Sequence, residues 1–448
     1  MCYLQSNLKK KFGWQTRTSV LLFAYFLITI GYSFSSGFYS LFSFFVLFLV
    51  LIFLILFFLR WDIFLLGFPN ILEFSSILLL IFVMLSFLLY GGIYQVKGAE
   101  FYLSQFLLGV AFLFSALYLF DVPRILRLNF LLLFLIAVTV RILVVFSSPE
   151  PIIDVYHITK IAPTVLLNGI NPYSYKGYPE LYRSISSNNY GYLPVSFLFF
   201  LPFVSIFHDP RAALILAEIA FFIILYFILR HSGFAREYKL DQIIPLLFLY
   251  NPRFSFITEQ SWIDILPILF ISLFVVALIF WRNWLIPALF FGLALASKTY
   301  YLLPMSLFLV RVKNHGLKLA AGSLVFFFFF LMPFYFWSPK DFVHSTILYP
   351  LSFQSLRLDL IHQSLTLNSF VFRYFHFDLP FFLILIILAA FYLLIFLRQE
   401  RGLDSFLRAS FIWFFIFFFL NREAFINYYY FVGNLALLTV SVELLGKA

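Results

Sequence analysis

The chain has 448 residues, of which 63% are hydrophobic and 11% are charged, and its mean hydropathy is +1.00. Soluble domains carry about 25% charged residues, so this composition excludes a soluble globular protein and predicts a chain that crosses the membrane many times. The net charge of +10 comes from basic residues scattered through short loops, as is typical of membrane proteins. We therefore expect membrane lipid as a partner and no nucleic acid.

Runs of about 20 apolar residues predict membrane-spanning helices. Such runs lie on both sides of a long polar segment, and they predict an all-α polytopic membrane bundle of about 13–14 transmembrane helices. The predicted spans are 19–34, 38–59, 72–91, 101–120, 128–147, 193–208, 211–230, 242–258, 263–281, 284–310, 318–337, 380–398, 405–420 and 427–445.

The basic residues predict which way the bundle faces. A basic cluster, residues 9–11 with Arg17, precedes the first span, and Lys and Arg are enriched in cytoplasmic loops. With the N-terminus in the cytoplasm, the alternation of spans carries two long polar segments, 148–191 and 338–379, to the outer face. We predict an integral protein of the bacterial inner membrane whose active site lies on that outer face.

Strict alternation of the middle spans conflicts with this charge pattern. It leaves the basic stretch 230–239 outside and puts the stretch 259–264, which holds two acidic residues, inside. The conflict disappears if 193–208 is re-entrant and the run 284–310 is broken near Lys298. The sequence leaves both threadings open.

The polar segment 148–191 is where function is expected first, because a chain that lies mostly in lipid keeps its ionisable groups where water reaches. Apolar residues at helical spacing follow Asp154, and Asn168-Gly169 is a typical helix end, so we predict an amphipathic helix on the membrane surface. Asp154 suits two roles there, the N-cap of this helix and a catalytic carboxylate. The residues at helical spacing are Val155, Ile158, Ile161, Ala162 and Val165.

Several motifs follow Asp154 in order along the chain. They are Asn168-Gly169-Ile170-Asn171-Pro172-Tyr173, Tyr190-Gly191-Tyr192-Leu193-Pro194, Asn251-Pro252 with Gln260 and Asp264, Ala294-Leu295-Ala296-Ser297-Lys298 with Pro304, Arg357 with Asp359 and Ser364, and Asn427-Tyr428-Tyr429. In this order they resemble the motifs of GT-C fold glycosyltransferases, nearest to the bacterial branch that resembles polyprenyl-phosphate-mannose-dependent mannosyltransferases. The resemblance covers 128–448, so we expect a GT-C-like catalytic region there and four accessory spans in 1–127.

The resemblance implies transfer of a sugar, with mannose favoured, from a polyprenyl-phosphate donor to a lipid, glycan or protein acceptor on the outer face. Asp154 is then the general base that takes the acceptor proton. The departing phosphate needs a cation, for which Lys298, Arg357 and Arg373 are candidates. Lys298 alternatively snorkels to the interface.

A divalent cation, Mg²⁺ or Mn²⁺, is the other candidate for stabilising the phosphate. The family loop often carries a second acidic residue beside the aspartate, whereas here Glu150 is the nearest acid, so no metal ligands are identified. The other predicted substrate contacts are His157, Asn171, Tyr173, Tyr190, Tyr192, Gln260, Asp264 and Tyr428. Tyrosines are also enriched at any membrane interface, and Glu259 with Asp264 is equally suited to holding spans together.

Two other classes of protein fit parts of the pattern. A transporter or flippase of lipid-linked glycans would suit a chain with many spans, intramembrane charges and proline-broken helices, but the sequence shows no internal repeat and its polar loops gather on one face. An enzyme that resembles O-antigen ligases would need an essential His and Arg in a late outer loop, where His344, His362 and His376 lie.

Overall fold

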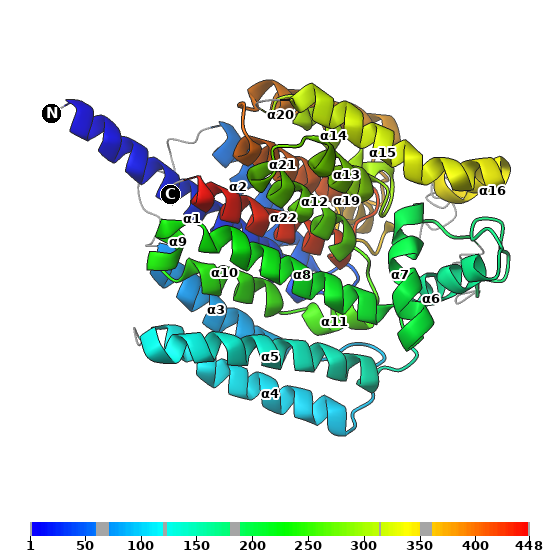
Figure 1. The fold of residues 1–448 in the computed structure, drawn as a ribbon, viewed down its shortest axis with the longest axis horizontal. Helices are drawn as coiled ribbons and strands as arrows, with labels where there is room; N and C mark the ends of the chain where they lie inside the picture. The colour runs from blue at the N-terminus through cyan, green and yellow to red at the C-terminus, as the bar shows by residue number, and fades with distance from the viewer. Residues whose placement is uncertain are drawn as a thin grey trace.

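The computed structural model describes residues 2–59, 71–119, 123–179, 189–312, 315–349 and 361–446. Every regular element within these residues is helical (Figure 1). Eight of the helices are long and apolar enough to cross a membrane. In lipid the backbone must satisfy its own hydrogen bonds, which a helix does within one segment. The all-α polytopic bundle that the sequence predicts is confirmed.

The helices differ in length, and several short ones separate the long spans. In chain order the elements are α1 (Cys2–Ser33), α2 (Leu41–Leu59), α3 (Ile71–Leu88), α4 (Ala99–Ser115), η2 (Ala116–Leu119), α5 (Pro123–Ser147), α6 (Asp154–Leu167), α7 (Pro194–Phe207), α8 (Arg211–Arg230), α9 (Gly233–Glu237), α10 (Leu240–Leu249), α11 (Phe254–Glu259), α12 (Ile265–Phe280), α13 (Leu285–Leu295), η3 (Tyr300–Leu302), α14 (Met305–Leu309), α15 (Gly316–Trp337), α16 (Pro339–Val343), η4 (His344–Leu348), α19 (Leu367–Phe375), α20 (Phe381–Arg398), α21 (Leu403–Leu420) and α22 (Ile426–Leu445).

Two predicted spans are broken. The run 242–258 divides into α10 and α11 at Asn251-Pro252, where proline lacks a backbone N–H and disfavours helix in the residue before it. The run 284–310 divides into α13, η3 and α14, and its break begins just before Lys298. Each of the other predicted spans coincides with a helix, within a few residues except at the N-terminal side of α1.

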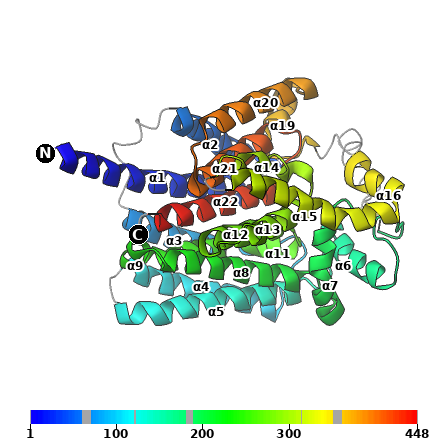
Figure 2. The same cartoon turned by 45° about the horizontal axis from the view of Figure 1, so that its top comes forward.

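The connections between helices gather at two ends of the bundle. At one end Tyr39 N donates to Gln363 O at 2.5 Å, and Val96 N donates to Ser147 O at 2.7 Å. Figures 1 and 2 show α6, α7 and α16 at this end, far from both chain termini. We call it the loop end, and it comprises residues 34–40, 89–98, 147–179, 189–193, 251–264, 338–349 and 361–379.

The opposite end holds both termini, and we call it the terminal end. Ser232 Oγ donates to Leu444 O at 2.8 Å, so the stretch 230–239, with Arg230, Arg236 and Lys239, lies there. The strict alternation of spans, which would separate these basic residues from the termini, is therefore wrong. The described parts of 148–191 and 338–379 share the loop end, as predicted.

The second threading accounts for this arrangement. Leu193 N, just before α7, donates to Lys298 O at 2.8 Å, and Asp209, just after α7, bonds Arg211, which also donates to Ser148 O at 2.7 Å. Both ends of α7 therefore stay near the loop end, and Figure 1 shows α7 lying across the long helices.

The pair α13 and α14 forms a hairpin of short helices. α13 has 11 residues, and the chain then reaches Lys298, whose carbonyl oxygen accepts from Leu193 N at the loop end. After α14 the chain is back at the terminal end, because Arg311 Nη1 donates to Leu397 O and Gln399 O at 3.0 Å each. Lys298 therefore lies at the tip of a broken helix pair.

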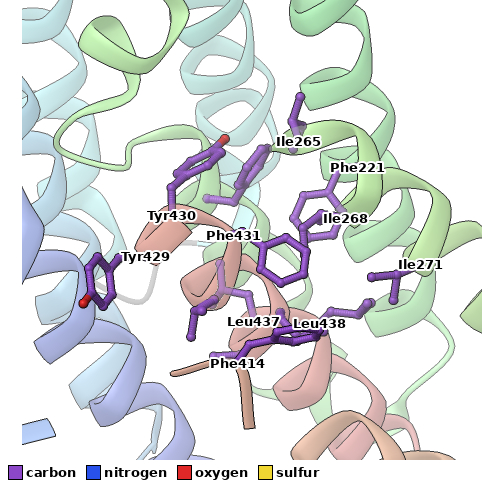
Figure 3. Packing of buried hydrophobic residues seen from close by; sticks show 14 of the residues in the cluster. Phe221, Ile265, Ile268, Ile271, Phe414, Tyr429, Tyr430, Phe431, Leu437 and Leu438 are labelled. Atoms are coloured by element: carbon purple, nitrogen blue, oxygen red, sulfur yellow. The ribbon is translucent and has the colours of Figure 1, made fainter. Parts of the chain in front are cut away.

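The centre of the bundle is α22, in whose apolar stretch 89% of the residues are buried. Figure 3 shows Phe431 and Leu438 of α22 facing Phe221 of α8 and Ile268 of α12. A tightly filled core of this kind fixes where each helix end lies. The first residues of α22 are thereby held at the loop end.

The N-terminal helices share this core with the rest of the chain. α1 packs against α22, Tyr25 hydroxyl donates to Leu247 O at 3.0 Å, and Ser86 Oγ donates to Tyr250 O at 2.9 Å. Arg253 Nε reaches back to Ser33 O at 2.7 Å. Residues 1–127 are thus joined to the break between α10 and α11, and their accessory role stays a prediction.

A buried ion pair inside the bundle was not foreseen from the sequence. Arg141 of α5 donates through Nε to Glu218 of α8 and through Nη2 to Leu249 O at 2.8 Å. Tyr430 hydroxyl donates to the other Glu218 oxygen at 3.1 Å. Arg141 and Glu218 were themselves the signal in the sequence, because ionisable residues inside membrane spans are rare. The pair links α5, α8, α10 and α22.

Gly92 offers a stability test of the loop end. A Cβ there would overlap the Glu259 carboxylate, which is fully buried and accepts from Ile93 N and Tyr94 N at 2.8 Å each. We expect Gly92→Ala to destabilise the protein by about 1–3 kcal/mol, measured by thermal unfolding in detergent. Gly233→Ala is the control, since nothing lies within 4 Å of a Cβ there; equal stability of the two variants would contradict the expectation.

Candidate functional site

Asp154 is the first residue of α6 and lies half-buried at the loop end. The helix forms as predicted, with Val155, Ile158 and Ala162 on its buried face. Its N-cap is Ile153, whose backbone is extended, and Asp154 Oδ1 accepts from Val155 N at 2.8 Å. The predicted N-cap at Asp154 is therefore one residue too late. The carboxylate still lies in the first turn, where the helix dipole favours a negative charge.

Arg211 joins the helix ends that surround the start of α6. Its side chain is fully buried, with Nη2 at 2.6 Å from Asp209 Oδ2 and Nη1 at 2.7 Å from Ser148 O. Its guanidinium lies 5.0 Å from the ring centroid of Tyr156 on α6. Arg211 thus ties the end of α5, the start of α8 and the first turns of α6, and so positions Asp154. Sequence reasoning missed it, although an arginine beside Asp209 at the start of a span was the available signal.

A second charged group lies where α12, α22 and the α13–α14 connection meet. Lys298 is 2% exposed and Asp264 is 1% exposed, and Lys298 Nζ donates to Asp264 Oδ1. Asn427 Nδ2 donates to Asp264 Oδ2 at 2.9 Å, and Lys298 Nζ lies 4.5 Å from the ring centroid of Tyr428. The ammonium is buried and paired, so Lys298 does not snorkel.

Tyr192 connects the two charged groups. Burial, and then the neighbouring Asp154, Tyr428 and Asp264, raise the pKa of Tyr192 well above its usual value. The charges of both carboxylates thus act on the same phenol, which keeps its proton. Its backbone is fixed from two sides, because Tyr173 hydroxyl donates to Tyr192 O at 2.8 Å and the next residue bonds the Lys298 carbonyl. We call the set Asp154, Tyr192, Asp264, Lys298, Asn427 and Tyr428 the polar centre.

Three residues that were predicted to contact the substrate, Asn171, Tyr173 and Tyr190, pack in the loop that carries Tyr192. Tyr173 and Tyr190 are fully buried, with ring centroids 5.9 Å apart and perpendicular packing. Tyr190 hydroxyl bonds Ser196 Oγ at 2.7 Å, and Asn171 Oδ1 accepts from Tyr173 N at 3.0 Å. These contacts shape the loop that carries Tyr192. A direct substrate contact by Asn171, Tyr173 or Tyr190 stays a prediction.

The other predicted residues have their described contacts elsewhere. Gln260 is buried and donates through Nε2 to Glu259 Oε2 at 2.8 Å. Arg373 of α19 donates through Nε to His362 O at 2.9 Å, and its guanidinium lies 4.6 Å from the ring centroid of Tyr39. Arg357 lies outside the residues that the structure describes. The structure therefore unites Asp154, Tyr192, Asp264, Lys298 and Tyr428 from the predicted set.

A cleft of about 450 Å³ runs along the outer side of α6. Residues three and four apart share one face of a helix, so the cleft follows the face on which Asp154 and His157 lie. Its lining combines polar and aromatic side chains with Ile161, Val165 and Ile170. The polar and aromatic members are Glu150, Tyr156, His157, Lys160, Thr164, Asn168 and Tyr175.

His157 in this cleft gives a pH prediction. Burial and Lys160 lower its pKa below the usual 6.5, against the opposing Glu150 and Asp154. The folded protein then binds this proton less readily than the unfolded chain, so the stability contribution of His157 is lost as pH falls below about 6.5. We expect Lys160→Ala to raise the His157 pKa and Glu150→Gln to lower it further, measured by NMR titration of ¹⁵N-histidine-labelled protein with His157→Asn for assignment. A shift of the His157 pKa in the same direction in both variants would contradict this expectation.

The second polar segment contains a histidine–aspartate pair. His362 Nε2 lies 2.9 Å from Asp378 Oδ1, and the ring of His362 stacks on Phe372 of α19. Although burial opposes it, hydrogen bonds from His362 and Asn368 hold the pKa of Asp378 below its usual range. The sequence did not predict α19. Its contacts are with α21 and with Phe44 of α2, whose ring centroid lies 4.3 Å from that of Phe370.

Metal ligands were left open by the sequence. Across the described part of the chain, no three His, Cys, Asp or Glu side chains gather in a way that would hold a metal ion. Mg²⁺ often binds through one or two carboxylates together with substrate phosphates, so a Mg²⁺ or Mn²⁺ contribution stays a prediction that a chelator tests.

Comparison with known proteins adds no assignment. No protein-family model, curated protein or solved structure matches this chain. Its function must therefore be argued from the polar centre and the motifs that form it.

Proposed function

We propose that this membrane protein is a glycosyltransferase that moves a sugar, with mannose favoured by resemblance, from a polyprenyl phosphate to a hydroxyl of a lipid, glycan or protein. The observation that carries the proposal is the polar centre. The charges of the half-buried Asp154 and of Asp264 both act on Tyr192, and Asp264 pairs with the buried ammonium of Lys298, at one end of an apolar bundle. A lipid-linked donor suits such a site, because its tail needs only apolar surface between helices.

The reaction needs a base and a stabilised leaving group. The acceptor oxygen attacks the anomeric carbon, the bond from that carbon to the phosphate oxygen breaks, and polyprenyl phosphate leaves with the bond electrons. Asp154 takes the acceptor proton, for which an ionised carboxylate within hydrogen-bond reach is suited. The cleft along α6 supplies polar and aromatic side chains beside Asp154 for a hydroxyl-rich acceptor.

Lys298 is the group in the described chain best suited to the departing phosphate. An ammonium has three donors, and the hydrogen bond to Asp264 occupies one of them. Asp264 and Asn427 orient the lysine, and the face of Tyr428 lies beside its charge. Fixed charges in a site with little water stabilise a developing phosphate charge strongly. Tyr192 is suited to donating a hydrogen bond, because its raised pKa keeps the phenol protonated.

The direct test is sugar transfer by the purified protein. Polyprenyl-phosphate sugars with different radiolabelled headgroups are offered with membrane lipids, glycans and peptides as acceptors, with and without a chelator. We expect label transfer from one donor class. Loss of transfer with the chelator, restored by Mg²⁺ or Mn²⁺, would add a metal to the site. No transfer from any donor in protein that retains its fold would count against the proposal.

A flippase or transporter of lipid-linked glycans is the second candidate. The broken pair α13 and α14 and the non-crossing α7 favour it, because transporters place broken helices at their substrate sites. Vesicles that contain the protein and a labelled lipid-linked glycan separate the two functions. Movement of the intact glycan lipid without cleavage of the sugar–phosphate bond would assign the transporter class.

A further inference from the structure

The cleft along α6 carries balanced charges. Its lining contains one acid, Glu150, and one lysine, Lys160. Burial and Lys160 hold the pKa of His157 below its usual 6.5, so the imidazole is neutral at pH 7. The neighbouring Arg211 is paired with Asp209 at 2.6 Å. Neither sign of charge predominates, so the cleft suits an uncharged ligand.

The cleft also offers both hydrogen-bond donors and acceptors in a space of small-molecule size. Its volume, about 450 Å³, lies within the range of about 300–1,000 Å³ that is typical of small-molecule sites. Lys160 has three donors, of which one is directed to the Tyr156 hydroxyl at 3.3 Å. The exposed Asn168 supplies a donor and an acceptor, and Glu150 supplies acceptors. A sugar hydroxyl donates and accepts, so it can use both kinds of group.

Tyr175 gives the cleft a ring on which a sugar can lie. The other lining tyrosine, Tyr156, is 1% exposed, and its ring centroid lies 5.0 Å from the Arg211 guanidinium and 5.3 Å from the Lys160 ammonium. Tyr175 is partly exposed, and its ring packs edge-on to Tyr178 at a centroid distance of 5.1 Å. The C–H groups on one face of a pyranose bury apolar area against such a ring.

The charge of Asp154 reaches both this cleft and the polar centre. Burial lowers the pKa of His157 in the cleft, and the charge of Asp154 opposes this. Burial raises the pKa of Tyr192 in the polar centre, and the same charge adds to this. A base that serves an acceptor in the cleft and a donor at the polar centre must act on both.

We propose that the cleft along α6 binds a neutral oligosaccharide as the acceptor, with one sugar ring on Tyr175 and its hydroxyls on Glu150, Lys160 and Asn168. This inference rests on the proposed function and narrows its acceptor from lipid, glycan or protein to a glycan. The balanced lining has no surplus cation for a phospholipid headgroup. The wall on α6 is helical, so it offers no sheet edge to a peptide.

The test is saturation-transfer NMR on the full-length Asp154→Asn protein in lipid nanodiscs, which measures binding without donor or turnover. The probes are the neutral trisaccharides mannotriose and maltotriose and the acidic trigalacturonic acid, each at low and high salt. We expect a neutral trisaccharide to bind at both salt concentrations, and Tyr175→Ala to weaken its binding about 2- to 10-fold. Tyr175→Phe keeps the ring and should keep the affinity. Tyr102→Ala is the matched control, because Tyr102 is 59% exposed and does not line the cleft.

Gly177→Ala is the second variant and serves if Tyr175→Ala unfolds. A Cβ at position 177 would lie 2.4 Å from the Tyr175 hydroxyl oxygen, so the ring must move, and we expect weaker binding. Gly233→Ala is its control, since nothing lies within 4 Å of a Cβ there.

Three results would overturn the inference. Absence of binding by both neutral trisaccharides in folded protein would do so, and transfer of sugar to a lipid or a peptide by that protein would leave the proposed function standing. Tighter binding of trigalacturonic acid, or binding lost at high salt, would mean a charged ligand. An equal loss in Tyr102→Ala would mean that Tyr175 forms no site. Glycan binding in a protein that transfers no sugar would instead keep the glycan site and count against the transferase.

Discussion

We expect Asp154→Asn to lower sugar transfer by about 10²- to 10⁴-fold, the contribution of a general base, and to leave the fold and membrane insertion intact. Asn has the same shape, so the hydrogen bond from Val155 N to the side chain at position 154 remains. What it lacks is a carboxylate able to take the acceptor proton. The measurement is the rate of label transfer at saturating donor, with detergent-solubilised protein checked by thermal unfolding.

Glu100→Gln is the matched control for this experiment. Glu100 is exposed and, like Asp154, carries its carboxylate in the first turn of a helix, here α4. We expect it to keep most of the transfer rate, because it lies outside the polar centre. Wild-type turnover in Asp154→Asn would leave the aspartate with a structural role in the first turn of α6, and the base would have to be sought elsewhere.

The second large effect concerns the buried pair of Lys298 and Asp264. Removing one partner leaves an uncompensated buried charge, and we expect Lys298→Met or Asp264→Leu alone to destabilise the protein by about 3–5 kcal/mol. The double variant Lys298→Met with Asp264→Leu should recover most of this stability, because both charges are gone. Thermal unfolding of the wild type, the two single variants and the double variant gives the coupling free energy between Lys298 and Asp264.

Transfer kinetics of the double variant then separate structure from function. If the ammonium contacts the donor phosphate, the stable double variant should show a raised KM for the donor and a lowered kcat. Asp404→Asn is the stability control, because it breaks the partly exposed pair with Arg408, which is worth about 0–1 kcal/mol. Unchanged donor kinetics in the double variant would mean that the buried pair only holds α12, α13 and α22 together.

The long apolar helices were predictable because lipid imposes one requirement on every residue of a span. Runs such as 41–58 and 381–398 have nothing but helix as a stable state in hydrocarbon. The breaks were harder to predict, because Asn251-Pro252 and the polar stretch at Lys298 each sit inside an apolar run of spanning length. The break near Lys298 was one of two threadings that the sequence left open, and the break at Asn251-Pro252 was not predicted, although proline disfavours helix there. The partners Ser33 O for Arg253 and Asp264 for Lys298 lie at these breaks.

The members of the candidate site were predicted on different grounds. Lys298 was selected because an ionisable group inside an apolar run needs a reason, Asp154 because it lies in the polar segment that follows a span, and Asp264 because its motif resembles one of the GT-C motifs. Arg211 beside Asp209, and Asn427 in a motif, each had a sequence signal, but their partners were not predicted. Their role depends on which helices become neighbours, and a single sequence does not contain that information.

The paired backbone beside Tyr192 joins two segments of the polar centre. Leu193 N donates to Lys298 O at 2.8 Å and Val195 N donates to Ala296 O at 3.1 Å, as between neighbouring strands of a sheet. We therefore expect the segment before α7 and the lysine-bearing connection to move together. A lipid-linked donor that binds at the polar centre would then enter between these two segments and the start of α22.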